Sequence, residues 1–162
     1  PGGYTVKFND VTFYQTPAAQ TNTLAAGGTL NFTGNYAFID ANHNGISDAW
    51  ENYYFGAAGA DRTQLTDTDG DGMPDYAEFI AGTDPTNAAS KFIFLSTTVQ
   101  TNQIVQLKWS AIPGRIYQLE NSTNLADWTP LTGWIQATAS PMTYSGTNAA
   151  SGSQFFRVQV RP

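Results

Sequence analysis

The sequence predicts a mainly β protein in which a small sandwich follows an acidic segment that holds two short helices. Apolar and polar residues alternate with a period of two toward both ends of the chain, as in half-buried strands. Only 12% of the 162 residues are charged, against about 25% in typical soluble proteins, so neutral polar residues must cover the surface. Because such residues favour strands and turns, we expect a strand segment at 1–38, an acidic zone at 39–90 and a β-sandwich at 91–162.

The N-terminal zone has two alternating stretches. Their apolar members are Tyr4, Val6, Phe8, Val11 and Phe13, then Leu30, Phe32, Tyr36 and Phe38. With no more than about 38 residues, the zone is too short to bury a core of its own. We expect its strand to pair with the sandwich of the same chain or with a neighbouring copy.

The C-terminal zone shows six strand patterns. They span 91–99, 104–110, 116–121, 128–136, 142–144 and 155–160. Their most distinctive residues are Leu107 and Trp109, Tyr117 and Leu119, and the run from Phe155 to Val160. These patterns resemble a fibronectin type III or immunoglobulin-like sandwich. Such folds normally have seven strands, so we expect one open sheet edge, which invites another strand.

The middle zone is acidic and contains an internal repeat. Ten of the 13 carboxylates lie between Asp40 and Asp84. A shift of 27 residues places Asp-x-Asn-x-Asn-Gly-x-x-Asp-x-x-Glu, which starts at Asp40, on Asp-x-Asp-x-Asp-Gly-x-x-Asp-x-x-Glu, which starts at Asp67. Carboxylates at this density need a cation, and the repetition indicates duplication.

Both copies match a twelve-residue calcium loop, whose oxygen ligands come from positions 1, 3, 5, 7 (through the backbone), 9 and 12, with glycine at position 6. The first loop offers Asp40, Asn42, Asn44, the Ile46 carbonyl, Asp48 and Glu51. The second loop offers Asp67, Asp69, Asp71, the Met73 carbonyl, Asp75 and Glu78. Hard oxygen donors in a large, flexible loop select calcium over magnesium. We expect two Ca²⁺ ions, with weaker binding at the first loop because it has fewer carboxylates.

The run from Asp67 to Asp75 and the Gly-Thr-Asp-Pro from Gly82 to Pro85 resemble thrombospondin type 3 and related EF-hand-like repeats of bacterial extracellular proteins. The resemblance covers roughly residues 40–86 and implies calcium binding outside the cell. It departs from paired sensor EF-hands at position 8, which is Ser47 or Pro74. We therefore expect no calmodulin-like switch.

A short helix is expected after each loop, because apolar residues recur there at i, i+3 and i+4. These residues are Trp50, Tyr53 and Tyr54 in the first helix, and Tyr76, Phe79 and Ile80 in the second. Gly82 is suited to end the second helix. Both apolar faces are expected to make core contacts, with the helices docked on the sandwich.

Composition argues against several functional classes. The net charge is −6 and no basic run occurs, so we expect neither a nucleic-acid partner nor membrane insertion. Cysteine is absent, and the single histidine, His43, falls at loop position 4, which supplies no ligand. No catalytic constellation is recognised. The chain begins at Pro1 and has no apolar stretch of about 18 to 20 residues, so we expect a processed, exported product.

These observations predict a secreted, non-enzymatic, calcium-braced structural protein of the cell surface or extracellular space. Its expected partners are further copies of itself, in a homo-oligomer or a filament built by N-terminal strand donation. The alternative is a carbohydrate-binding or adhesion module, because the indole rings of Trp109, Trp128 and Trp134 can stack on sugars. Three coplanar exposed indoles would favour a glycan ligand, whereas buried indoles favour the structural role.

Overall fold

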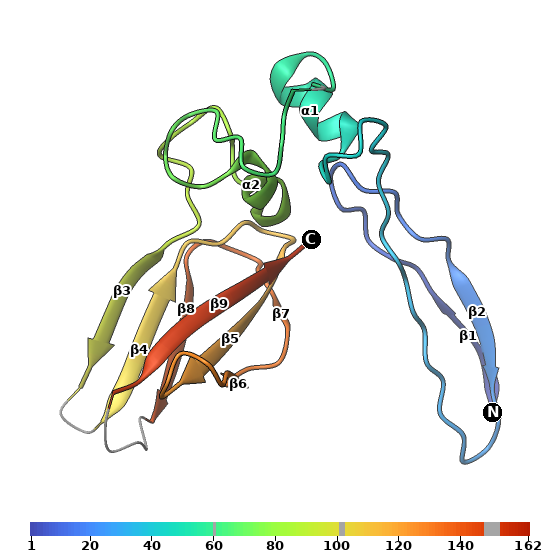
Figure 1. Ribbon diagram of the computed structural model, residues 1–162. Helices are drawn as coiled ribbons and strands as arrows, with labels where there is room; N and C mark the ends of the chain where they lie inside the picture. The colour runs from blue at the N-terminus through green and yellow to red at the C-terminus, as the bar shows by residue number, and fades with distance from the viewer. Residues whose placement is uncertain (60, 101–102, 148–152) are drawn as a thin grey trace. The chain divides into compact units, whose positions relative to one another are not determined.

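The computed structural model describes residues 1–59, 61–100, 103–147 and 153–162. The chain forms two compact units, Pro1–Asp61 (unit 1) and Arg62–Pro162 (unit 2) (Figure 1). Helix α1 (Asp48–Phe55) belongs to unit 1 and helix α2 (Asp75–Ala81) to unit 2. The prediction of a mainly β chain with two short helices is confirmed. The two copies of the acidic repeat lie in different units.

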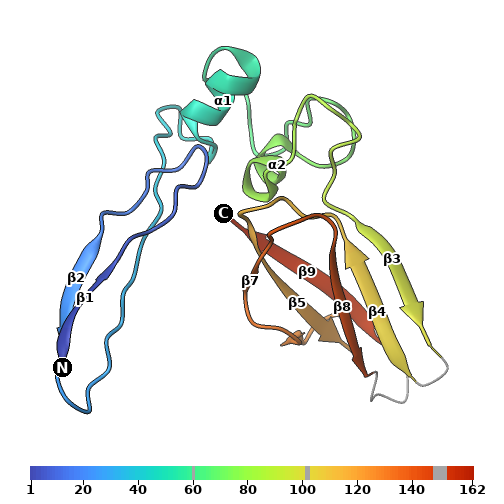
Figure 2. The ribbon, with the colours of Figure 1, turned by 180° about the vertical axis from the view of Figure 1, so that it is seen from behind.

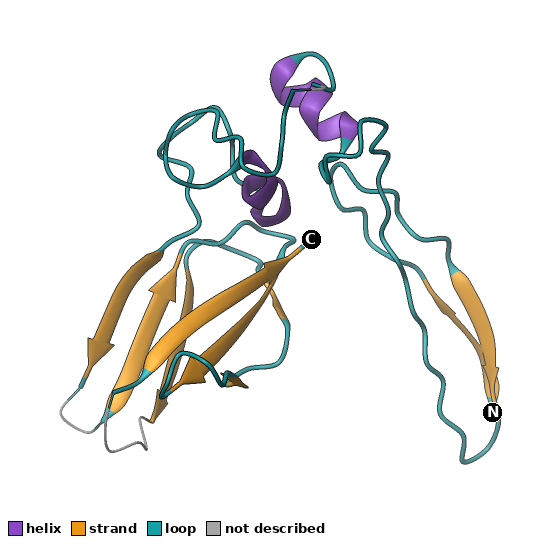
Figure 3. Cartoon of the chain, viewed as in Figure 1, coloured by secondary structure: helices purple, strands orange, loops and turns teal. Residues whose placement is uncertain are grey.

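In unit 1, strands β1 (Gly2–Val6) and β2 (Gln20–Leu24) form an antiparallel pair. The register aligns Gly2 with Leu24 and Val6 with Gln20. Outside this pair and α1, the described residues of the unit form loops (Figure 3). The ladder partner of β1 is thus β2 of the same chain. Pairing of β1 with the sandwich or with a neighbouring copy would use its other edge and stays a prediction.

The strand predicted from Leu30 to Phe38 is wrong. This stretch is a loop with one isolated bridge, between Gln15 and Ala37. Its side chains nevertheless alternate between half-buried and exposed, as the sequence pattern indicates. The main chain is held by side chains instead of by a neighbouring strand, since Gln20 Nε2 donates to Thr33 O at 2.6 Å and Tyr36 OH donates to Asn9 O at 2.5 Å.

The first helix packs against residues of its own unit, and its expected docking on the sandwich stays a prediction. Trp50 is buried and Tyr54 half-buried, and their ring centroids are 5.0 Å apart. The ring of Tyr53 contacts Phe13 from the N-terminal zone, with centroids 5.5 Å apart, although Tyr53 is 71% exposed. Ser47 Oγ, just before the helix, also donates to Phe13 O at 3.0 Å.

Unit 2 contains two antiparallel sheets, seen from behind in Figure 2. One has the order β3–β4–β8, with β3 Phe94–Val99, β4 Ile104–Trp109 and β8 Met142–Thr147. In the other, β5 (Ile116–Ser122) pairs with β9 (Phe155–Arg161) and with two short strands, β6 (Thr129–Pro130) and β7 (Ile135–Gln136). Alternate residues of β4 and β5 share one core, whose buried members are Val105, Leu107, Trp109, Ala111, Tyr117, Leu119 and Ala137. The finer prediction of an immunoglobulin or fibronectin type III sandwich is not confirmed.

The single strand predicted at 128–136 is divided into β6 and β7. Between them Leu119 O accepts hydrogen bonds from the backbone N–H groups of Leu131 and Thr132. Thr132 Oγ1 then accepts the Leu119 N–H at 3.0 Å. A side-chain oxygen thus takes the place of a ladder carbonyl, and the regular pairing stops.

Within the described residues, β3 pairs only with β4 and β9 only with β5. Each strand therefore presents one unpaired edge. All six residues of β3 are exposed. The expected open edge is present in unit 2.

Candidate metal centre

The second loop is shaped by its own carboxylates. The Gly72 N–H donates to Asp67 Oδ2 at 2.9 Å, the Asp71 N–H to Asp69 Oδ1 at 3.1 Å, and the Met73 N–H to Asp71 Oδ1 at 2.7 Å. Gly72 has φ +93°, a left-handed conformation that glycine adopts readily. These side-chain to backbone bonds form a turn frame that leaves one oxygen of Asp69 and one of Asp71 outside it.

The acidic side chains of this loop converge. Asp67, Asp69 and Asp71 each offer a carboxylate oxygen, and the three atoms lie within 4.8 Å of one another. Helix α2 contributes Glu78, the twelfth position of the loop, which is fully buried. Like charges at this separation repel one another and favour a bound cation.

Within the described part of the chain, three buried oxygens of this loop have no hydrogen-bond donor: Asp69 Oδ2, Asp71 Oδ2 and Glu78 Oε2. They belong to positions 3, 5 and 12, which are ligand positions of a calcium loop. A buried carboxylate oxygen without a partner is costly. The donor set is entirely hard oxygen and therefore fits Ca²⁺.

Glu78 is oriented by the turn that ends α2. Thr83 Oγ1, which is buried, donates to Glu78 Oε1 at 3.0 Å and leaves Oε2 unpaired. Burial raises the pKa of Glu78 to about 7; the Thr83 bond acts in the lowering direction, and the charges of Asp69, Asp71 and Asp75 raise the pKa further. In the absence of an ion, this carboxylate therefore holds a proton more readily than an ordinary glutamate.

Asp75 bonds to protein groups on both of its oxygens. Oδ1 accepts the Thr68 N–H at 2.9 Å, and Oδ2 accepts Thr68 Oγ1 at 2.7 Å and Arg62 Nη1 at 3.0 Å. The side chain is fully buried. These contacts give Asp75 a role in closing the loop, and its predicted contact with an ion stays a prediction, as do those of the Met73 and Ile46 carbonyls.

The first loop has the same frame. The Gly45 N–H donates to Asp40 Oδ2 at 2.8 Å, and the Ile46 N–H donates to Asn44 Oδ1 at 2.8 Å. Asp48 accepts the Ala41 N–H, as Asp75 accepts the Thr68 N–H in the second loop. The internal repeat recognised in the sequence therefore extends to individual hydrogen bonds.

The two loops differ at positions 3 and 5, where the first has asparagine. Asn42 Nδ2 lies 3.3 Å from Glu51 Oε2, and Asn44 Nδ2 lies 3.0 Å from Glu51 Oε1. Glu51 is fully buried, and the Gly59 N–H also reaches its Oε1 at 3.4 Å. None of the buried side-chain oxygens of the first loop is unpaired in the described structure.

Residues 67–88 match the bacterial TSP3 repeat. The matched range contains the second loop, α2 and the turn from Gly82 to Pro85, and it excludes the first loop. TSP3 repeats bind Ca²⁺, and those of bacteria are typical of secreted proteins. The repeat therefore indicates a calcium-binding extracellular module. No curated protein and no solved structure matches the chain.

Sequence reasoning missed the residues that contact the second loop from outside it. Lys91 Nζ donates to Asp71 O at 2.7 Å and lies 3.6 Å from Asp71 Oδ2, while Arg62 pairs with Asp75. Neither cation belongs to the twelve-residue pattern. The role of Thr83 was within reach, because the Gly-Thr-Asp-Pro motif marks its position.

None of the helices in the described part of the chain is long and apolar enough to span a bilayer.

Proposed function

We propose that this chain is a non-enzymatic structural module of the extracellular space, in which calcium closes the second loop. The three buried carboxylate oxygens that accept no hydrogen bond from the described residues carry this proposal. Asp67, Asp69, Asp71 and Glu78 would hold the ion with their side chains. A bound Ca²⁺ adds the positive charge that balances these carboxylates, and it stabilises the folded chain by binding it much better than the unfolded chain.

The second loop is coupled to the sandwich through α2. Glu78 is the last position of the loop and also belongs to α2, and its neighbour Phe79 is fully buried. The Phe79 carbonyl accepts Arg115 Nη2 at 3.0 Å, and Arg115 is itself buried just before β5. An ion that holds Glu78 would therefore also stabilise the packing of α2 against the sandwich.

The first loop is proposed as a second, weaker calcium site. It has three carboxylates, Asp40, Asp48 and Glu51, where the second loop has five. Affinity in such loops depends on the number of charged ligands and on the rigidity of the loop. Titration should resolve a tight event from the second loop before a weak one from the first.

Calcium titration of metal-free protein tests the main proposal. We expect saturable heat by calorimetry and a rise in Tm, and both should be largely lost in Asp69→Ala. Asp61→Asn is the matched control, since it removes a carboxylate of the acidic zone that is exposed. A wild-type chain with no heat and the same Tm in calcium and in chelator would contradict the proposal.

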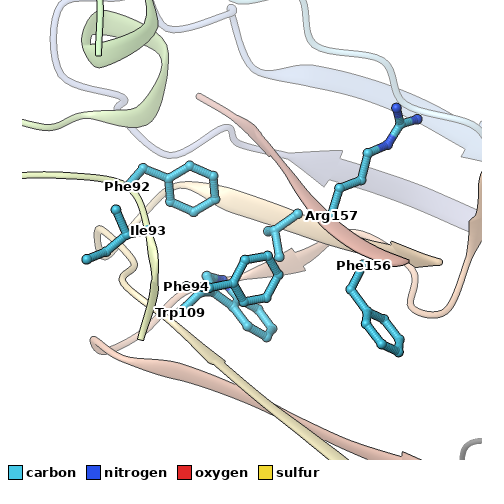
Figure 4. Close-up of a pocket in the computed structure, with 7 residues that line it drawn as sticks. Phe92, Ile93, Phe94, Trp109, Phe156 and Arg157 are labelled. Atoms are coloured by element: carbon cyan, nitrogen blue, oxygen red, sulfur yellow. The ribbon is translucent and has the colours of Figure 1, made fainter. Parts of the chain in front are cut away.

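For assembly, we propose that the N-terminal strand of one copy adds to the open edge of another. A groove of about 230 Å³ lies there, lined mainly by Phe92, Phe94, Trp109 and Phe156 (Figure 4). No described residue of 1–38 is fully buried. The apolar side chains of this zone could therefore bury further surface when its strand adds to another copy.

Sedimentation of the full chain tests this assembly. We expect polymers from the wild type, monomers from Phe94→Lys at the groove, and unchanged polymers from Leu65→Lys, since Leu65 is an exposed loop residue outside it. A wild-type chain that stays monomeric at high concentration, or Phe94→Lys polymers like those of wild type, would refute strand addition.

The carbohydrate-binding alternative has less support. Trp109 is only 3% exposed. The guanidinium groups of Arg157 and Arg161 cover the rings of Trp128 and Trp134, at 4.3 and 3.9 Å from the ring centroids. The three indoles therefore do not form the exposed, coplanar platform that a sugar ring would require.

A further inference from the structure

We infer that the two asparagine side chains of the first loop act as its built-in substitute for a cation. The closed form of the first loop then needs no calcium, whereas that of the second does. This inference rests on the proposed function only for the second loop. It assigns different roles to two copies of one repeat, on the basis of two residue positions.

The contacts within the first loop carry the argument. Both carboxylate oxygens of Glu51 accept an amide N–H, one from Asn42 and one from Asn44. Asn42 Nδ2 also donates to Gly59 O at 3.0 Å, which ties the loop to the chain beyond α1. The buried charge of Glu51 is thus met by charge-assisted hydrogen bonds. At the equivalent place in the second loop, Glu78 Oε2 has no donor.

Side-chain chemistry explains why the two loops differ. An aspartate has two acceptor oxygens, so it can hold the turn frame with one and a metal ion with the other. An asparagine has one acceptor oxygen and an NH₂ donor. In the first loop, Asn42 Oδ1 accepts the Asn44 N–H at 3.3 Å and Asn44 Oδ1 accepts the Ile46 N–H at 2.8 Å. An ion bound here would have to share each of these oxygens with the frame, and it would also displace the bonds to Glu51.

Hydrogen exchange of the full chain tests the inference directly. The reporters are the equivalent frame amides, Gly45 and Ile46 in the first loop and Gly72 and Met73 in the second. In metal-free protein we expect the first pair to exchange about tenfold more slowly than the second. The reason is that the bonds from Asn42 and Asn44 to Glu51 hold the first loop closed, and the second loop has no such bonds to Glu78. Added calcium should protect the second pair strongly and the first pair little.

Reciprocal substitutions supply the matched controls. The double variant Asn42→Asp with Asn44→Asp should lose the calcium-independent protection of Gly45 and Ile46 and regain it on calcium addition. Asp69→Asn with Asp71→Asn should show calcium-independent protection of Gly72 and Met73 and lose the tight binding heat. Substitutions that leave both patterns unchanged would overturn the inference.

The wild-type measurement remains decisive if a double variant does not fold. Gly45 and Ile46 amides that exchange freely without calcium, and become protected at the same calcium concentration as Gly72 and Met73, would overturn the inference. A second loop that never gains protection from calcium would refute the proposed function. The first-loop inference would still be judged by its metal-free protection, so the two failures are distinguishable.

Discussion

Glu78 is the last ligand position of the acidic loop and lies within α2, and the fold shifts its ionisation toward the neutral form. Its carboxylate is buried among Asp69, Asp71 and Asp75, and its pKa rises to about 7 from an ordinary value of 4.5. An acid whose pKa is raised by folding binds more protons in the folded state than in the unfolded state between these two values. Its contribution to stability is therefore greatest below pH 4.5 and is lost as the pH rises through about 7.

We therefore predict that the Tm of unit 2 in metal-free protein receives a contribution from Glu78 that falls between pH 5 and pH 8. Glu78→Gln, which resembles the protonated side chain at every pH, should abolish this pH dependence. Calcium affinity of the wild type should rise over the same pH range, because the ion must displace the proton. Thermal melts of both proteins in metal-free buffers test this, and identical pH slopes would contradict it.

At the scale of elements, both helices end at a glycine with a left-handed backbone, Gly56 after α1 and Gly82 after α2. Their φ values are +78° and +79°. A Cβ at Gly56 would meet no atom within 4 Å, whereas one at Gly82 would lie 2.8 Å from Arg115 Nε. Arg115 has little room to move, because it is buried and bonded to Phe79 O.

This pair of glycines gives a matched prediction. Gly56→Ala should destabilise its helix by about 1 kcal/mol, the usual cost of a left-handed non-glycine residue. Gly82→Ala should cost about 1 kcal/mol more, because it also disturbs Arg115 and the seat of α2 on the sandwich. Hydrogen exchange of each helix measures the two costs locally. Equal costs would show that the contact between α2 and Arg115 is weak.

The elements that the sequence predicts well are those set by local patterns. The glycine at position 6, the helix after each loop and the alternating strands β4, β5 and β9 all follow from neighbouring residues. The loop from Leu30 to Phe38 was wrongly predicted as a strand because alternation specifies inward and outward side chains but not a ladder partner. The division of 128–136 depends on Thr132 bonding to Leu119, a tertiary contact.

The candidate site shows the same limit. The twelve-residue pattern located the acidic cluster Asp67, Asp69 and Asp71 from spacing alone. It treats asparagine and aspartate as equivalent oxygen donors, so the bonds from Asn42 and Asn44 to Glu51 lay outside its reach. Lys91 is likewise invisible to it, because its contact with Asp71 is made by chain folding over 20 residues.

At the scale of the whole molecule, the stabilisation that calcium gives through the second loop should arise within unit 2 alone. The contacts that complete this loop come from Arg62, Thr83 and Lys91, all within Arg62–Pro162. The core shared by β4 and β5 also lies within this unit.

We predict that a fragment spanning residues 62–162 folds and keeps the calcium-induced rise in Tm that the second loop gives the full chain. A fragment that starts at Thr63 should show a smaller rise, because Asp75 then loses the Arg62 guanidinium and becomes a less well-paired buried carboxylate. Melting curves of both fragments with and without calcium measure the effect. If the longer fragment fails to respond to calcium while the full chain responds, unit 1 must contribute to the tight site, and the separation of the two loops into independent units would be refuted.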